Sequence, residues 1–438
     1  MPDSPNTRQL LPEILHQIFF HLVVNRSSRH WPVEQMPCDL MAASMVCMDW
    51  WLEARRLVDE RMLHSVFSHL CHPTEAKRFA MLMGESKRLG LDYWTLVVRA
   101  EIYVNELIDL NPLDRPIKDE HGATVVSNTA FDRRMEAYTT IMELCPPNLI
   151  DLTVILPGVD LAESWSVDRF CHYLEKMEPA CASIRRFRLV GRDREVVHPK
   201  IVSFVASLAP NLRLISLYDF TLDSALSTAL RRFTGLRGAH FSGMVTDDHL
   251  PTLLPSWPYL HYFKYDHIGQ TDLGASVVSL ARSCPRVKDF SLQRLGDRSM
   301  LPVPALALCH VLLQLPLTRF SVSFCNIDDT FLLALMAHGT ALQHIELYKC
   351  SEIVGDTAVL GWKDGWPNLK RLLLDRCDRL SFVFVKKVIG SCVKLEQIEL
   401  PAHLHKDNDC RELITQGGFQ IKMQSRLWER VDVGSGAM

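Results

Sequence analysis

The sequence predicts an α/β solenoid, in which each repeat contributes one parallel strand and one helix. The first observation is a sequence motif that recurs after 27 residues and is called the strand phrase below. Residues 342–350 and 369–377 both have the pattern apolar-x-x-apolar-x-apolar-x-x-Cys. The second is the alternation inside each phrase, which gives a short strand with one buried face. Because a single unit of this kind cannot bury its own apolar face, it needs a neighbour on each side.

Length and composition fit such an array. The chain has 438 residues, of which 47% are hydrophobic and 23% charged, as in ordinary folded proteins. A net charge of −3 argues against nucleic acid as the partner. No apolar run is long enough to span a membrane, and the polar N-terminus does not read as a secretory signal. Thirteen cysteines, an odd number, indicate reduced thiols and hence the cytosol or the nucleus.

The chain begins with a predicted helix whose apolar residues form one stripe. Leu15, Ile18, Phe19 and Leu22 follow the i, i+3, i+4, i+7 pattern, and Pro12 suits the first helical turn. A polar loop is expected over 25–37. A second helix, capped by Asp39 and running to Trp50, and a short third helix from Ala54 complete the unit.

These residues resemble an F-box. Leu11-Pro12-x-Ile14-Leu15-x-x-Ile18-Phe19-x-x-Leu22 matches its opening, and Val46-Cys47-x-x-Trp50-x-x-x-Ala54 matches its close. The resemblance implies a trihelical unit over 8–65 that docks onto the Skp-family adaptor of a cullin-RING ubiquitin ligase. It assigns the adaptor contact to Leu11, Pro12, Ile14, Leu15, Ile18, Phe19, Leu22, Val46, Cys47 and Trp50. The alternatives are a helical cap on the solenoid and, with no basic face to support it, a helix-turn-helix.

Four elements are expected between this unit and the regular array. The sequence predicts a helix over 74–88 and a strand at 97–102. Residues 109–129, rich in Asp, Pro, Asn and Gly, are expected to form an inserted loop. A further helix over 131–144 leads into the array.

The regular array is predicted from ten strand phrases. They begin at Leu149, Ile184, Leu212, Leu236, Leu260, Val287, Leu317, Leu342, Leu369 and Leu395. Their mean spacing of about 27 residues leaves room for a strand and an α-helix in each unit, the pattern of a leucine-rich repeat. We expect the leucine-rich-repeat solenoid over 74–400, with one parallel strand per repeat stacked in sequence order, and a C-terminal cap and tail over 401–438.

The cysteines follow the same repeat. Cys325, Cys350 and Cys377 each come eight residues after the first apolar position of their phrase. A small, weakly hydrogen-bonding side chain fits beneath the turn that leaves the strand, so we interpret these cysteines as structural. This variety of repeat resembles the one in F-box proteins with leucine-rich repeats, and so points independently to that family.

One cluster of side chains has the character of a metal site. Residues 403–410 hold His403, His405, Asp407 and Cys410, which are possible metal ligands. The alternative is a solvated turn in which Asp407 or Asp409 caps a final helix over 410–416. We predict no metal, no cofactor and no catalytic residue, because no phosphate loop, nucleophile elbow or zinc-protease motif is present.

The strand positions also predict the partner-binding surface. Positions one, four and six of each phrase point inward, so positions three, five and seven face solvent on the concave side. The predicted contact residues are Arg186, Arg188, Tyr218, His240, Tyr262, Lys264, Arg319, His344, Glu346, Tyr348, Arg371 and Asp375. Asp266, Asp289 and Glu399 occupy equivalent positions. Exposed Tyr and Arg among polar groups are typical of interfaces, although a merely soluble sheet face is the alternative.

The resemblance implies a function. It makes the chain a substrate-recognition subunit of an SCF-type ubiquitin ligase, which binds the Skp-family adaptor, through it a cullin, and a protein substrate that the sequence does not identify. The alternative is a leucine-rich-repeat scaffold or inhibitor that binds a partner without assembling a ligase. On both hypotheses the chain is not itself an enzyme.

Overall fold

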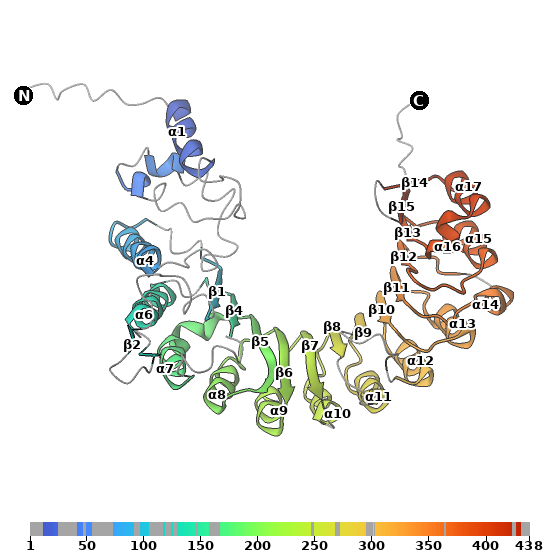
Figure 1. The fold of residues 1–438 in the computed structure, drawn as a ribbon, viewed down its shortest axis with the longest axis horizontal. Helices are drawn as coiled ribbons and strands as arrows, with labels where there is room; N and C mark the ends of the chain where they lie inside the picture. Colours follow the sequence, from blue (N-terminus) through green and yellow to red (C-terminus); the bar gives the residue numbers. More distant parts are fainter. Residues whose placement is uncertain are drawn as a thin grey trace, which may run out of the picture. The chain divides into compact units, whose positions relative to one another are not determined.

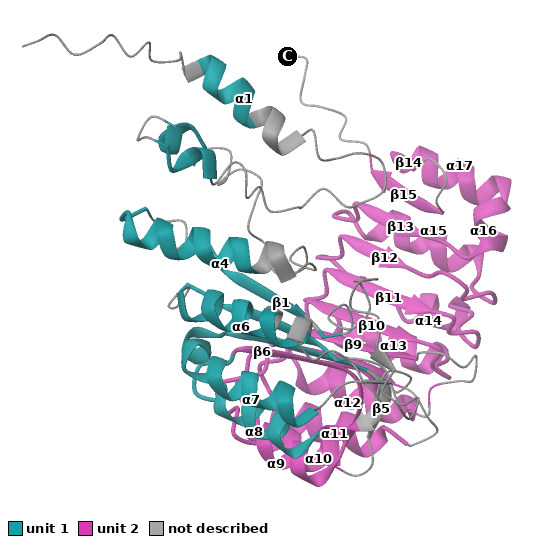
Figure 2. Ribbon diagram, turned by 60° about the vertical axis from the view of Figure 1, so that its left-hand side comes forward, with its two compact units in different colours: residues 1–193, 198–212 teal, residues 194–197, 213–438 magenta. Residues whose placement is uncertain are grey.

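The computed structural model describes residues 12–24, 42–46, 50–54, 73–91, 97–104, 117–118, 124–125, 129–144, 148–156, 167–246, 249–267, 272–294, 301, 303–362, 365–422 and 426–430. The chain divides into two compact units (Figure 2). Unit 1 comprises residues 1–193 and 198–212, and unit 2 comprises residues 194–197 and 213–438. In the described ranges, no helix is both long enough and apolar enough to cross a membrane.

Unit 1 begins with helices. Helix α1 (Pro12–Val24) starts at the predicted proline and has Glu13 in its first turn, where the helix dipole favours a negative charge. Residues 50–54 are helical as well. The predicted third helix beyond Ala54 lies outside the described residues. Helix α4 (Pro73–Arg88) matches the helix predicted over 74–88.

Three parallel strands follow, all in unit 1 except the last three residues of β5. They pair in the order β1 (Arg99–Tyr103), β4 (Asp151–Ile155) and β5 (Arg186–Val196). The helices of the unit's repeats are α6 (Thr129–Leu144), α7 (Val167–Met177), the 3-10 helix η4 (Glu178–Ser183) and α8 (Pro199–Ser207). Within the predicted loop over 109–129 the structure describes a short antiparallel pair, β2 (Ile117–Lys118) and β3 (Thr124–Val125), and the last residue of the range begins α6.

Unit 2 contains the rest of the array. Its strands are β6 (Leu214–Leu222), β7 (Gly238–Thr246), β8 (Tyr262–His267), β9 (Asp289–Arg294), β10 (Arg319–Ser323), β11 (His344–Tyr348), β12 (Arg371–Leu373), β13 (Gln397–Glu399), β14 (Phe419–Ile421) and β15 (Leu427–Arg430). Its helices are α9 (Ser224–Leu230), α10 (His249–Leu253), η5 (Leu254–Ser256), α11 (Gly274–Ser283), α12 (Ala305–Gln314), α13 (Asp329–His338), α14 (Asp356–Leu360), α15 (Phe382–Ser391), α16 (Ala402–Lys406) and α17 (Asn408–Gln416). Within this unit the strands line the inner side and the helices the outer side (Figure 1).

Strand order follows sequence order through most of unit 2. Each strand from β6 to β13 pairs in parallel with the next, which confirms the predicted solenoid. At the end of the array a cap was expected over 401–438, but its antiparallel strands were not predicted. There β15 pairs antiparallel with β13, and β14 pairs antiparallel with β15. Because Trp428 and Phe419 are buried, this hairpin closes the last repeat.

The core lies between the strands and the helices. Leu342, Ile345 and Leu347, at positions one, four and six of their phrase, are at most 1% exposed. Aromatic rings extend the core from strand to strand, with Phe290 and Phe320 stacked at 5.7 Å between ring centroids. Each repeat is therefore stabilised by its neighbours.

A left-handed residue recurs at one position of the repeat, inside β6 and just after β10, β11 and β12. Asp219, Phe324, Lys349 and Arg376 have φ between 55° and 59°, and each follows the first apolar residue of its phrase by seven. This conformation costs an L-residue roughly 1 kcal/mol. The residue after each one is buried, and in three of the repeats it is a cysteine.

The three cysteines lie where the sequence predicted them, beneath the turn. The thiols of Cys325, Cys350 and Cys377 contact the carbonyl oxygens of Ser323, Tyr348 and Leu347 at 3.6, 3.7 and 3.3 Å. Burial raises the pKa of Cys325 to about 12. This supports the interpretation of Cys325 as an inert, structural thiol.

Candidate functional site

The first candidate surface is formed by the N-terminal helices. Phe19 of α1 is fully buried, and its ring lies 5.4 Å from that of Trp50 in an edge-on contact. His16 Nδ1 is 2.7 Å from Glu53 Oε1. The two halves of the predicted motif therefore pack against each other.

This packing separates core side chains from exposed ones. Leu15 and Phe19 face the interior, so they support the surface from behind. Four large apolar side chains stay exposed, at 43%, 40%, 67% and 53%, and we call them the apolar quartet: Ile14, Ile18, Val46 and Leu52. Ile14 and Ile18 lie one turn apart on one face of α1. Sequence reasoning did not select Leu52.

The remaining predicted adaptor residues are only partly described. Trp50 is half-buried. Leu11 and Cys47 lie outside the described residues, and so do the side chains of Pro12 and Leu22. Their assignment to the adaptor contact stays a prediction.

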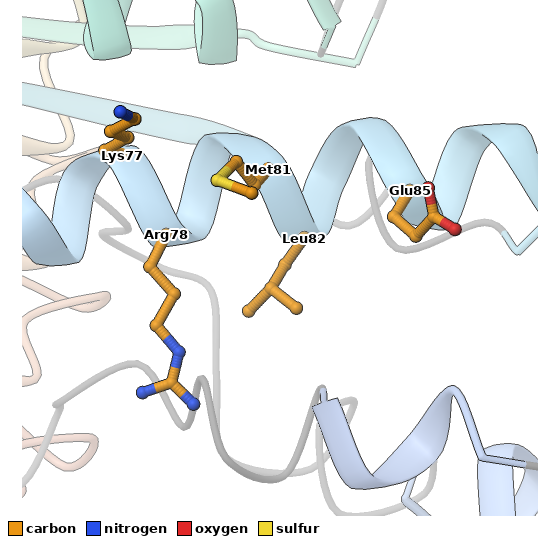
Figure 3. Close-up of a pocket in the computed structure, with 5 residues that line it drawn as sticks. All are labelled: Lys77, Arg78, Met81, Leu82 and Glu85. Atoms are coloured by element: carbon orange, nitrogen blue, oxygen red, sulfur yellow. The ribbon is translucent and has the colours of Figure 1, made fainter.

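Helix α4 carries a second candidate surface in unit 1. A hollow of about 430 Å³ is lined by Lys77, Arg78, Met81, Leu82 and Glu85. Arg78 and Leu82, one turn apart, point to the same side of the helix (Figure 3). Phe79 and Met83, each about 100° further round the helix, are fully buried. The sequence signal for this surface is the amphipathic pattern of α4.

The strand side of unit 1 presents two arginines. Arg186 and Arg188 on β5 are exposed, as predicted, and their register partners on β4 are Asp151 and Thr153. Asp151 lies 3.6 Å from Arg99 on β1. The face of this unit is therefore polar and carries charge of both signs.

In unit 2 the ten other predicted partner-binding residues are all exposed or half-buried. Three of them form a polar chain with Asp266. Tyr218 Oη lies 2.9 Å from His240 Nδ1, and His240 Nε2 lies 3.0 Å from Asp266 Oδ2. Lys264 Nζ is 3.4 Å from the same carboxylate oxygen. The carboxylate favours the tautomer with the proton on Nε2, so Nδ1 can accept the hydrogen bond from Tyr218.

One expectation about this chain is corrected. Asp266, which the strand pattern placed on the solvent face, is 5% exposed. Its Oδ2 atom contacts both His240 and Lys264, while its Oδ1 atom is buried without a hydrogen-bond partner in the described structure. A buried carboxylate held by such partners is a rigid part of the surface rather than an exposed contact.

A second group on this face is a row of five register partners. In strand order from β8 to β12 the row holds Tyr262, Asp289, Arg319, His344 and Arg371. Burial, followed by the charge of Asp289, raises the pKa of Tyr262 to about 12. Arg319 Nη1 lies 3.6 Å from Asp289 Oδ2, although burial still raises the pKa of that carboxyl. Burial, then the charges of Arg319 and Arg371, lower the pKa of His344.

The last predicted contact residues lie beside this row. Ser321 Oγ donates to Glu346 Oε2 at 3.1 Å. Asp375 Oδ1 accepts from Arg426 Nη1 at 2.8 Å. The Arg376 guanidinium lies 5.6 Å from the Tyr348 ring centroid. Sequence reasoning missed Ser321, although position five of its phrase places it on this face.

The possible metal cluster at 403–410 is built from side chains with other contacts. His403 Nε2 lies 2.8 Å from the Leu380 carbonyl oxygen, and the His405 ring packs edge-on against Trp428. Asp407 caps α17 by accepting from Cys410 N at 2.8 Å, as one of the alternatives predicted. Among the described residues, no three His, Cys, Asp or Glu side chains are grouped as metal ligands. The absence of a metal stays a prediction.

Comparisons with known proteins relate the chain to solved repeat structures. No protein-family model matches it, and no curated protein does. It is similar to the Rad7 and Elc1 complex from yeast at 13% identity, with 75% of this chain and 83% of that chain covered and a TM-score of 0.42. It is also similar to the leucine-rich repeat-containing protein LegL7 from Legionella pneumophila at 11% identity, with coverages of 73% and 90% and a TM-score of 0.37. With TM-scores below 0.5, neither likeness bears on what this chain binds.

Proposed function

We propose that this chain is the substrate-recognition subunit of an SCF-type E3 ubiquitin ligase. On this proposal the N-terminal helices bind the Skp-family adaptor, and through it a cullin. The strand face of the repeats binds a protein target. The chain supplies no catalytic residue, and it promotes ubiquitin transfer by holding the target near the enzyme that carries ubiquitin.

The observation that supports adaptor binding most is the apolar quartet. Its side chains stay in water although Leu15 and Phe19 beside them are buried. Large apolar groups gathered in a small helical unit are typical of a docking surface. Three of the four, Ile14, Ile18 and Val46, also belong to the sequence pattern that resembles an F-box.

The test is a pull-down of a recombinant Skp-family adaptor with Ile14→Asp/Ile18→Asp. Both side chains are at least 40% exposed, so the change leaves the core in place. Losing two anchors of this kind typically costs about 2 kcal/mol or more, which is roughly thirtyfold in affinity. The matched control is Leu306→Asp/Leu313→Asp on α12, where the leucines are 72% and 56% exposed.

Three outcomes would overturn the adaptor proposal. The first is a wild-type chain that does not bind the adaptor. The second is undiminished binding by the α1 variant, and the third is an equal loss in the α12 control. Each of them would favour a leucine-rich-repeat scaffold or inhibitor that acts without a ligase.

A further inference from the structure

Three neighbouring strands of unit 2 present an arginine, a histidine and a second arginine side by side. Arg319 on β10, His344 on β11 and Arg371 on β12 are register partners. Adjacent strands lie about 4.8 Å apart. Each arginine is therefore one strand away from the imidazole, and both long side chains can reach a ligand placed over it. This arrangement concentrates hydrogen-bond donors at one place on the strand face.

The arginines keep donors for a ligand. Arg371 is exposed, and in the parts of the chain that the structure describes its guanidinium has no hydrogen bond or ion pair. Arg319 is exposed too, and its ion pair with Asp289 is long, at 3.6 Å. A guanidinium carries five N–H donors in a planar fork that matches phosphoryl and carboxylate groups.

The imidazole between them is half-buried. Its Nδ1 atom is buried without a hydrogen-bond partner in the described structure, so a ligand on the strand face can contact only the exposed part of the ring. The lowered pKa of His344 agrees with the geometry, since burial and the two arginines oppose a third positive charge.

Two nearby acids have other partners. Glu346 accepts a hydrogen bond from Ser321, and Glu396 pairs with Lys370 at 3.1 Å. Asp289 partly neutralises Arg319 at 3.6 Å, and the charge of Arg371 acts on the nearby Glu399. Among the described residues no carboxylate has a hydrogen bond or ion pair with Arg371, so this guanidinium stays available to a ligand.

We propose that Arg319, His344 and Arg371 form an anion-binding row that takes a phosphoryl or carboxylate group from an acidic segment of the protein target. The inference rests on the proposed function only in that the strand face is the target-binding surface. It adds the chemistry of the target, which presents an anion to β10–β12.

The test uses the full chain and three labelled peptides of equal length. One is a Gly-Ser peptide with two adjacent phosphoserines, the second is its unphosphorylated form, and the third is oligo-glutamate. Binding is measured by fluorescence anisotropy for the wild type, for Arg319→Gln/Arg371→Gln, and for Arg232→Gln/Arg282→Gln. The last variant removes the same charge from two exposed positions on the helix side. Arg282 lies in the last turn of α11, and Arg232 follows the end of α9.

We expect the wild type to bind at least one anionic peptide and not the uncharged one. The row variant should lose at least about tenfold in affinity, because charge-assisted hydrogen bonds disappear, while the helix-side control stays within about twofold. Whichever anionic peptide binds more tightly identifies the source of the anion. Equal losses in both variants, or no binding of either anionic peptide by the wild type, would overturn the anion row.

The two proposals can fail separately. Adaptor pull-down with the same protein preparations reports on α1 and residues 42–46 and 50–54, far along the sequence from β10–β12. A row variant that loses peptide binding but keeps the adaptor supports the inference. A wild-type chain that binds the anionic peptide but no adaptor overturns the ligase proposal and leaves the row intact.

Discussion

The stacked register makes a quantitative prediction for Ile345→Ala. Ile345 is 1% exposed on β11 and lies between its register partners Phe320 and Leu372. The substitution removes three carbons from the core, which at about 0.8 kcal/mol each gives about 2.4 kcal/mol of lost transfer free energy. Incomplete collapse of the cavity adds to this, so a loss of roughly 2–5 kcal/mol in the free energy of unfolding is expected.

Urea denaturation of the full chain measures this loss from the transition midpoint and slope. The control is Val383→Ala on α15, whose side chain is 52% exposed and should change stability by less than about 0.5 kcal/mol. If Ile345→Ala were as mild as the control, residue 345 would not lie between the neighbouring strands. The parallel stacking of β10, β11 and β12 would then be wrong.

Two further predictions concern unit 2. Lys349→Gly relieves the strain of φ +55° but loses the contact of the Lys349 ammonium with the Phe324 ring at 4.5 Å, so its urea midpoint should stay close to the wild type. Lys349→Val should be less stable than Lys349→Gly by about 1–2 kcal/mol, because a β-branched residue resists this backbone conformation; equal midpoints would contradict this. For Glu399, burial, then the charges of Asp375 and Glu346, raise the pKa above its ordinary value. The folded state therefore favours the protonated carboxyl, and the contribution of Glu399 to stability is lost as the pH rises through its pKa. Glu399→Gln should therefore raise the urea midpoint at pH 7. In acid the midpoint of this variant should stay close to that of the wild type. A gain that is larger in acid than at pH 7 would reverse the sign of this argument.

The strands could be predicted because one face of each is buried. In residues 342–347 the apolar positions one, four and six are the buried ones. Register then follows, since a shift by one residue would expose the whole apolar set. The last helix could be predicted from a local hydrogen bond, the cap that Asp407 forms on α17.

Other features of the fold carry no periodic signal. The pair β2 and β3 has two residues in each strand, too few for alternation to be recognised. The left-handed residues Phe324 and Lys349 are not types that mark a turn in sequence. Tertiary structure imposes their conformation, because the chain must turn there to bury the cysteine that follows.

The candidate surfaces were predictable in part for the same reason. Strand position indicated which side chains face away from the core, but not how they pair with one another. Tyr218, His240 and Asp266 come from three different repeats, and only the register brings them into one chain of hydrogen bonds. On α1 the helical stripe identified Leu15 and Phe19 as core residues, whereas the exposure of Ile14 could not be read from the stripe.

The parallel register also explains why a search for short motifs finds no site although the strand face is ordered. Residues at the same position of successive phrases become neighbours at one strand spacing, so Arg319, His344 and Arg371 meet although a whole repeat separates each from the next. The residues of a binding site on such a surface come from successive repeats and are not close together in the sequence. Its extent is set by the array, which ends where β15 covers the edge of β13. A target recognised by this face must therefore match a row of side chains that runs across the strands, and one substitution in the row can alter recognition without disturbing the repeat that carries it.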